Sequence, residues 1–245
     1  MLKYPYTNFQ GVNGMRPTLL IDLDDTLLDF HKGEYNAVKK SLAQMGLPST
    51  DELARRYSEI NDAQWKRLEK GEITRQEVLV GRFRLLFDEM GVDASADQMK
   101  AVYEGLISQE GHLFDGAQEL LEALQADYDL CIISNGTAVV QDARITKTGL
   151  APYFKHIFIS QRVGVNKPSP IFFERCLEAM PEVRREDCLI IGDSLSSDIL
   201  GGMLSGIKTC WLNRTGNTAK GDVKPDYEVT SLDEILPLVR KIFGN

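Results

Sequence analysis

Short apolar runs that alternate with helical patterns constrain the fold of this chain more than any other feature. The runs are TLLIDL at 18–23, LCIIS at 130–134, HIFIS at 156–160, CLIIG at 188–192 and IKTCWL at 207–212, with a weaker YEVT at 227–230. Nearly continuous apolar strands separated by amphipathic helices are typical of a parallel sheet that is covered on both faces. The sequence therefore predicts an α/β fold with a doubly wound parallel sheet.

One long interval interrupts this alternation. Between Asp29 and about His112 no strand pattern occurs, and four helical stretches follow one another. These stretches cover 31–46, 49–71, 74–91 and 95–111, each ending at a glycine, with Ser49 or Thr50, Thr74 and Ser95 as N-cap candidates. We therefore predict an inserted all-helical cap domain at 30–112, an α/β core at 16–29 and 113–245, and a flexible leader at 1–15. Because ligands bind at the carboxyl ends of parallel strands, the cap is expected to face those ends.

Composition and charge narrow the class of protein. An apolar share of 43% and a charged share of 26% are ordinary for a folded globular chain. No apolar run approaches the ~18 residues that span a bilayer, and the N-terminus lacks the apolar centre of a signal peptide, so a cytoplasmic protein without a membrane partner is expected. The formal net charge of −8 argues against binding a nucleic acid polymer. A phosphorylated substrate would need cations placed close to it.

The four cysteines do not indicate a metal site. Cys131, Cys176, Cys188 and Cys210 lack C-x-x-C spacing and mostly lie in or beside apolar strands. Buried, reduced thiols are expected.

Three aspartates stand at the end of the first predicted strand. Asp22, Asp24 and Asp25, followed by Thr26, place several carboxylates where the strand leaves the core. Carboxylates moved out of water need a cation, a proton or a solvent-open cleft. One aspartate could attack phosphorus while a second, protonated carboxyl supplies a proton to the leaving oxygen. The alternative is a turn in which Asp24, Asp25 and Thr26 satisfy backbone N–H groups.

Polar residues also follow three later strands. They are Ser134-Asn135-Gly136 after the run at 130–134, Lys167 in NKPSPIFF after 156–160, and Asp193 and Asp198, which flank three serines, after 188–192. Backbone N–H groups and a hydroxyl can bind phosphate oxygens, and carboxylates can complete an oxygen-rich Mg²⁺ site. Each has a simpler alternative, namely a common turn, a solvated lysine or a helix N-cap. Four such signals in chain order, each at a strand end, favour a functional site.

These four motifs resemble those of the haloacid dehalogenase superfamily. The resemblance rests on DLDDTL, the Ser134-Asn135-Gly136 turn, Lys167 in NKPSPIFF, and Gly192-Asp193-Ser194 with Asp198, and it covers nearly the whole chain from Thr18 onward. It implies a Rossmann-like core with a helical cap. It also implies a Mg²⁺-dependent phosphatase that works through an aspartyl phosphate.

The resemblance assigns a role to each motif residue. By it, Asp22 is the nucleophile and a Mg²⁺ ligand, Asp24 is the general acid/base with its backbone carbonyl on the metal, and Asp193 binds Mg²⁺. Ser134 and the Asn135 backbone hold the phosphoryl group, Lys167 neutralises charge, and Asp198 supports the metal shell or Lys167. Asp24 argues against a dehalogenase, because halide departure needs no proton.

The substrate is expected to be a small phosphorylated metabolite, and the protein a monomer or homodimer. Phe30, Tyr35, Trp65 and Phe83 of the cap offer aromatic surface that could stack a nucleobase, or simply cap core, and His31 could touch the substrate or serve as a hinge contact. The first motif, the cap and SQRVGVNKPSPIFF are most similar to bacterial pyrimidine-nucleotide 5′-phosphatases that remove non-standard nucleotides. The alternatives are a sugar-phosphate or phosphoglycolate phosphatase, a phosphomutase, and, in another class, a phospho-accepting receiver module.

Overall fold

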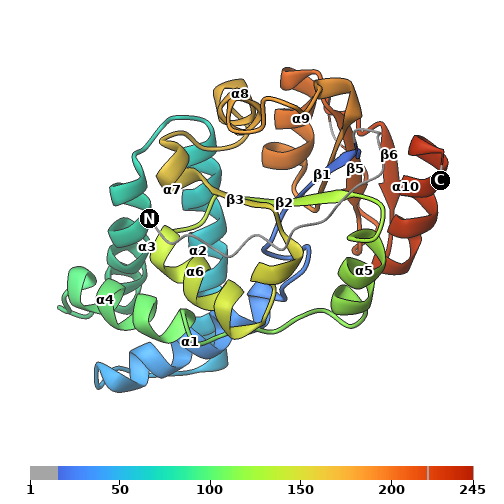
Figure 1. Ribbon diagram of the computed structural model, residues 1–245. Coiled ribbons are helices and arrows are strands. Elements are labelled where there is room, and N and C mark those ends of the chain that lie inside the picture. The colour runs from blue at the N-terminus through green and yellow to red at the C-terminus, as the bar shows by residue number, and fades with distance from the viewer. Residues whose placement is uncertain (1–15, 220, 245) are drawn as a thin grey trace.

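The computed structural model describes residues 16–219 and 221–244, so the leader predicted at 1–15 lies outside the described residues. Six strands form one sheet in the order β3-β2-β1-β4-β5-β6, and every neighbouring pair is parallel (Figure 1). The strands are β1 (Thr18–Ile21), β2 (Asp129–Ser134), β3 (His156–Ile159), β4 (Cys188–Gly192), β5 (Lys208–Leu212) and β6 (Tyr227–Val229). Each overlaps one of the six predicted runs, which confirms the α/β class and the parallel sheet.

Residues along β1 to β4 alternate between two hydrophobic clusters, one on each face of the sheet. Leu19 and Ile21 belong to the cluster that includes α5 (Ala117–Leu124) and α10 (Ile235–Phe243). Leu20 belongs instead to the cluster that includes α8 (Pro170–Glu178). The other core helices are α6 (Ala138–Lys147), α7 (Ser160–Val163) and α9 (Leu200–Ser205). Burial on both faces explains why the strands read as continuous apolar runs.

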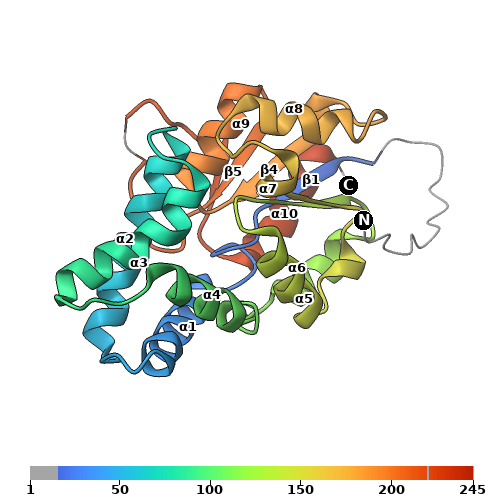
Figure 2. The same cartoon turned by 90° about the vertical axis from the view of Figure 1, so that its left-hand side faces the viewer.

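Four consecutive helices form the cap and pack around a cluster of their own. They are α1 (Phe30–Gln44), α2 (Asp51–Glu69), α3 (Arg75–Met90) and α4 (Ala96–Ile107). Their core includes Tyr57, Phe83 and Tyr103, whose ring centroids lie 5.2 to 5.5 Å apart. Figure 2 shows the four helices gathered on one side of the molecule, beside the sheet. Phe83 is therefore cap core, which the sequence left open.

The predicted N-caps are present in three of these helices. Thr50, Thr74 and Ser95 each accept a hydrogen bond from the backbone N–H three residues later, and Glu77 completes a capping box with Thr74. Ser49 is not the cap, because its hydroxyl donates to the carbonyl of Lys39 at 2.7 Å. Each cap satisfies backbone groups that a helix end otherwise leaves unpaired.

Two adjacent segments connect the cap to the core. The backbone N–H of Asp29 donates to the carbonyl of His112 at 2.8 Å, and that of Phe114 donates to Leu27 at 3.0 Å. The chain thus leaves the sheet and returns to it at one place. None of the helices in 16–219 and 221–244 is long and apolar enough to cross a membrane. All four cysteines are buried and free, as predicted.

A carboxyl group lies inside the cap. Glu34 is 1% exposed and accepts hydrogen bonds from Ser58 Oγ at 2.6 Å and Asn61 Nδ2 at 2.8 Å. Burial raises its pKa to about 7, against the lowering effect of the Ser58 hydrogen bond; Asp62 adds to the increase, while His31 and Arg82 oppose it. Because the pKa is higher in the folded state than the ordinary value of 4.5, ionisation of Glu34 destabilises the fold as pH rises through that window.

We predict that Glu34→Gln gains stability relative to the wild type as pH rises. Below about pH 4.5 the carboxyl is protonated in both folded and unfolded chains, so its titration contributes nothing to the difference. Above pH 7 the wild type carries the buried charge, which costs about 3 kcal/mol at most. Urea unfolding of both proteins at pH 5 and pH 8 measures this change. Glu52→Gln, an exposed position on α2, is the control, and an equal pH trend in both variants would contradict the prediction.

Candidate active site

The predicted site residues gather at the carboxyl ends of the central strands. Asp22 follows β1, Ser134 ends β2, and Asp193 follows β4. The sheet order reverses direction between β1 and β4, and open α/β sheets bind ligands at such a switch point. A cavity of about 220 Å³ opens there. Its lining includes Asp22, Asp24, Phe30, Trp65, Ser134, Asn135, Lys167, Asp193 and Asp198.

A buried lysine lies between two carboxylates at this point. Lys167 is 1% exposed, and its Nζ donates to Asp22 Oδ1 and Asp198 Oδ1, each at 2.6 Å, and to the carbonyl of Ile133 at 3.0 Å. Burial lowers the pKa of Lys167, but the carboxylates of Asp198 and Asp22 outweigh it and raise that pKa above its ordinary value. The lysine is therefore a fixed cation, with all three ammonium donors used.

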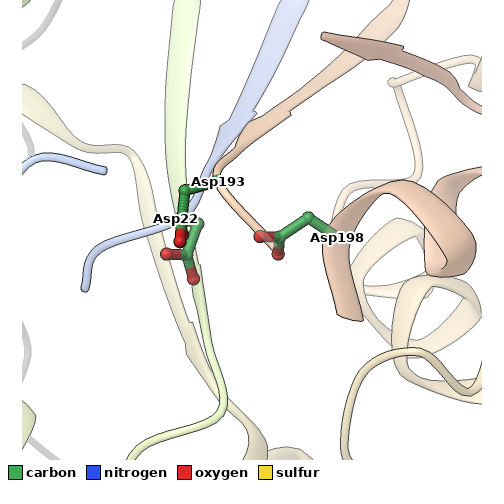
Figure 3. Close-up of side chains that lie close together, drawn as sticks. All are labelled: Asp22, Asp193 and Asp198. Atoms are coloured by element: carbon green, nitrogen blue, oxygen red, sulfur yellow. The ribbon is translucent and has the colours of Figure 1, made fainter. Parts of the chain in front are cut away.

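Three carboxylates converge beside this lysine. One oxygen each from Asp22, Asp193 and Asp198 lies within 4.8 Å of the other two, and Figure 3 shows the three side chains pointing toward one another. Burial raises the pKa of Asp193 to about 8, and Asp198 and Asp25 add to the effect. Burial also raises the pKa of Asp22, although Lys167 opposes it. Clustered, partly dehydrated carboxylate oxygens are the ligands that Mg²⁺ prefers, so this donor set fits a divalent cation.

Gly192 makes the approach of Asp198 possible. A Cβ at position 192 would lie 2.3 Å from Asp198 Oδ2, a distance that only glycine avoids. Asp198 Oδ2 accepts a hydrogen bond from the backbone N–H of Ser194 at 3.2 Å, while Oδ1 binds Lys167. Asp198 thus has both oxygens hydrogen-bonded to protein donors, which fits support of Lys167 better than direct metal binding.

The three aspartates that follow β1 differ in their structural roles. Asp25 adopts a left-handed conformation with φ of 56°, and its Oδ1 accepts from the backbone N–H of Phe30 at 3.0 Å. The turn interpretation therefore applies to Asp25. Arg214 donates to the carbonyls of Asp25 at 2.6 Å and Thr26 at 3.0 Å, which also fixes the turn. Asp22, Asp24 and Asp25 all line the cavity, but Asp25 Oδ1 is occupied by the hydrogen bond within the turn.

Two side chains of α6 hold the carboxylate of Asp24. Gln141 Nε2 donates to Oδ2 at 2.6 Å, and Arg144 Nη1 forms an ion pair with Oδ1. Arg144 Nε also donates to the carbonyl of Glu110, in the segment that returns from the cap, at 2.9 Å. Neither Gln141 nor Arg144 stood out in the sequence. Only their separation by three residues, on one helix face, could have linked them to a shared partner.

The loop after β2 presents a hydroxyl donor and backbone to the cavity. Ser134 Oγ accepts hydrogen bonds from the Gly136 N–H at 3.1 Å and from Gln141 Nε2 at 2.8 Å, so its own O–H remains available as a donor. The Asn135 side chain pairs with the backbone of Lys167, accepting from its N–H and donating to its carbonyl, both at 2.9 Å. These two hydrogen bonds fix the Asn135 side chain against the Lys167 backbone.

An arginine of the cap reaches into these loops. Arg75 Nη1 donates to the carbonyls of Asn135 at 3.0 Å and Gly136 at 3.1 Å, and Nη2 donates to Ser160 Oγ and Asn166 Oδ1. Its guanidinium carbon lies 5.6 Å from the centre of the Trp65 ring. Sequence analysis did not identify Arg75, because an arginine at a helix start usually reads as a solvated side chain.

Of the cap residues that the sequence suggested as possible substrate contacts, some line the cavity and others are exposed at the surface. Phe30 and Trp65 line the cavity. His31 is not among the lining residues; its side chain is 60% exposed and its Nε2 lies 3.4 Å from Asp25 Oδ2. Tyr35 is also exposed and accepts a hydrogen bond from Lys39 on the same helix.

Comparison with known proteins defines the class to which this fold and site belong. A family model described as haloacid dehalogenase-like hydrolase matches residues 17–206. The chain therefore belongs to the haloacid dehalogenase-like hydrolase family and is an enzyme, as the sequence motifs predicted.

Individual relatives cover nearly the full chain. The chain is 38% identical to the HAD-hydrolase YfnB of Bacillus subtilis over 89% of this chain and 93% of that protein. The crystal structure of YfnB bound to magnesium superposes with a TM-score of 0.87 and covers 92% of this chain and 99% of that one, at 36% identity. Pyrimidine 5′-nucleotidase PynA of Streptococcus pneumoniae is 36% identical over 91% of this chain and 94% of its own length. Pyrimidine 5′-nucleotidase YjjG of Escherichia coli is 30% identical over 91% and 97%. The predicted similarity to this subfamily is confirmed.

We predict that Lys167→Met lowers the free energy of unfolding by about 3–5 kcal/mol at pH 7, because it leaves two buried carboxylates without their cation. Urea unfolding measures the loss. Lys155→Met removes a half-exposed partner of Asp129 and should cost at most about 1 kcal/mol. Adding Asp198→Asn to Lys167→Met should restore part of the stability. Equal losses in the two single variants would contradict the central position of Lys167.

Proposed function

We propose that this enzyme is a Mg²⁺-dependent phosphomonoesterase that acts through an aspartyl phosphate on Asp22 and hydrolyses pyrimidine nucleoside 5′-monophosphates, including non-canonical ones. The observation that best supports this chemistry is the hydrogen bonding of the two carboxylate oxygens of Asp22. Its Oδ1 binds the Lys167 ammonium, while its Oδ2 makes no hydrogen bond to any residue in 16–219 or 221–244. A cavity-lining carboxylate with one oxygen oriented and the other unbonded is suited to nucleophilic attack.

The reaction proposed has two half-reactions that share these residues. In the first, an oxygen of Asp22 bonds to phosphorus, the bond from phosphorus to the leaving oxygen breaks, and that oxygen takes a proton from the Asp24 carboxyl. In the second, a water oxygen attacks the same phosphorus and gives a proton to Asp24. The acyl phosphate bond breaks, which releases inorganic phosphate and regenerates the Asp22 carboxylate.

Charge and position account for most of the catalysis in this proposal. The attack of one anion on another is favourable only where nearby cations reduce the repulsion. Lys167 supplies one fixed cation, and the Ser134 hydroxyl and the Asn135 backbone supply donors to the phosphoryl oxygens. Asp22, Asp193 and the Asp24 backbone carbonyl would hold Mg²⁺, which when bound neutralises charge on the phosphoryl oxygens. The crystal structure of YfnB bound to magnesium supports this assignment.

The similarity of this chain to the pyrimidine 5′-nucleotidases PynA and YjjG supports a nucleotide substrate. In this proposal the cap at 30–112 encloses the leaving group, with Phe30 and Trp65 as aromatic contacts, since both line the cavity that Asp22 also lines. His31, exposed and paired with Asp25, is left out of the substrate contacts. Membership in a hydrolase family favours repeated turnover over a receiver module that retains its phosphoryl group.

We predict that Asp24→Asn loses kcat/KM in proportion to the basicity of the leaving group. For a nucleotide, whose leaving alkoxide needs a proton, the loss should be about 10²–10⁴-fold, and it should shrink for aryl phosphates with stable leaving anions. Steady-state kinetics on a graded series of aryl phosphates measure the trend. Asp22→Asn should abolish hydrolysis of every member, whereas Asp62→Asn, at the cavity edge, should show no leaving-group trend. A uniform loss in Asp24→Asn would rule out the acid role.

The substrate is tested by comparing kcat/KM across UMP, dUMP, dTMP, sugar phosphates and phosphoglycolate. The proposal predicts that a pyrimidine nucleotide leads by tenfold or more, which corresponds to about 1.4 kcal/mol of transition-state stabilisation. A tenfold preference for a non-nucleotide would refute the nucleotidase assignment and leave the phosphatase chemistry intact.

In the same panel, EDTA should stop hydrolysis of every substrate and Mg²⁺ should restore it. Full activity after exhaustive chelation would refute the metal assignment.

A further inference from the structure

A buried arginine on the cap wall of the cavity has few partners. Arg82 of α3 is 4% exposed and lines the cavity. Within the described residues only its Nη1 makes a hydrogen bond, to Asn61 Oδ1 at 2.7 Å, and its buried Nε has none. No carboxylate of those residues lies within salt-bridge distance of it. A buried guanidinium with unused N–H groups is costly unless a ligand supplies acceptors.

The cap holds this guanidinium rigidly in place. Its central carbon lies 4.9 Å from the ring centre of Tyr103, 5.0 Å from Phe83 and 5.9 Å from Tyr57. Asn61 donates to Glu34 through Nδ2, so its Oδ1 must face Arg82 and the Trp65 indole N–H, which donates to it at 3.1 Å. The amide orientation is thus fixed from both ends. Arg82 is oriented by a network rather than left to swing into solvent.

Other polar atoms on the same wall also lack partners. The Tyr103 hydroxyl and Glu104 Oε1 are buried without a hydrogen bond, and both residues line the cavity. Asp62 and Glu69, two further acidic residues of the cap, also line the cavity. A second anionic group on the substrate would be repelled there, whereas an uncharged group with a carbonyl oxygen would satisfy Arg82 without that repulsion.

We propose that Arg82 is a specificity-determining residue that donates a hydrogen bond to an uncharged carbonyl oxygen of the leaving group, such as the ring carbonyl of a pyrimidine base. This inference rests on the proposed function, because it identifies the residue that would recognise the base. Asn61 and Glu34 are positioning residues that act through Arg82. Ribose 5-phosphate has the same phosphate ester but no ring carbonyl, so it should gain nothing from Arg82.

The test is the ratio of kcat/KM for UMP to that for ribose 5-phosphate. Arg82→Met and Arg82→Lys should each lower this ratio by tenfold or more, because a site that hydrogen-bonds a substrate group discriminates strongly against its loss. Arg84→Met and Arg84→Lys, at an exposed position on the same helix, should leave the ratio unchanged. Arg82→Lys keeps a positive charge among the three aromatic rings. If Arg82→Met does not fold, the ratio measured for Arg82→Lys therefore tests the proposal.

Uridine gives a second readout that does not depend on the phosphate ester. In the wild type it should inhibit ribose 5-phosphate hydrolysis competitively, and Arg82→Lys should raise its inhibition constant tenfold or more. A wild-type ratio near one would refute the nucleotide part of the proposed function. A wild-type ratio well above one that Arg82→Lys leaves unchanged, together with an unchanged inhibition constant, would overturn the Arg82 site alone.

Discussion

The ammonium group of Lys167, buried between the carboxylates of Asp22 and Asp198, is the interaction on which the site depends. It joins three segments that are far apart in the sequence: the end of β1, the loop before α8 and the short helical turn Leu195–Ile199 after β4. A buried ion pair contributes little net stability, but breaking one side of it is costly. The three segments are therefore tied together, and Asp22 is held with one oxygen oriented by the lysine.

The second constraint is that cap and core share the cavity. Arg75 donates to carbonyls of the loop after β2, and Glu69 accepts a hydrogen bond from Ser196 at 2.7 Å, so two cap helices contact the segments that directly follow Ser134 and Asp193. Partial burial lowers the pKa of Arg75 and raises that of Glu69. Both shifts have the same cause, since closing the cap over the strand ends removes water from charged groups. Exclusion of water also strengthens electrostatic interactions inside the cavity.

The features that the sequence predicted depend on residues close together in the chain, whereas the features that it missed depend on contacts between distant residues. Strand runs, the helical insertion and the caps at Thr50 and Thr74 rest on residues within a few positions of each other, so sequence patterns revealed them. Sequence analysis did not identify four polar residues of the site, because each forms its hydrogen bonds with another element or another turn of helix. These residues are Arg75, Arg82, Gln141 and Arg144. Arg144 and Asp24, for example, are 120 positions apart. His31, which the sequence left as either a substrate contact or a hinge contact, has a largely exposed side chain that lies beside Asp25.

The sequence by itself determined the sheet, the inserted cap and the family, because apolar periodicity fixes which faces are buried and the motifs fix the chemistry at the strand ends. Tertiary structure alone decided how the charges are shared. It assigned Asp25 to the turn, paired Asp198 with Lys167, and surrounded Arg82 with aromatic rings in a cavity wall. The physical reason is that the burial and pairing of a charged group depend on neighbours brought together by folding. A linear pattern shows which residue types are present, but their distances exist only in the folded chain.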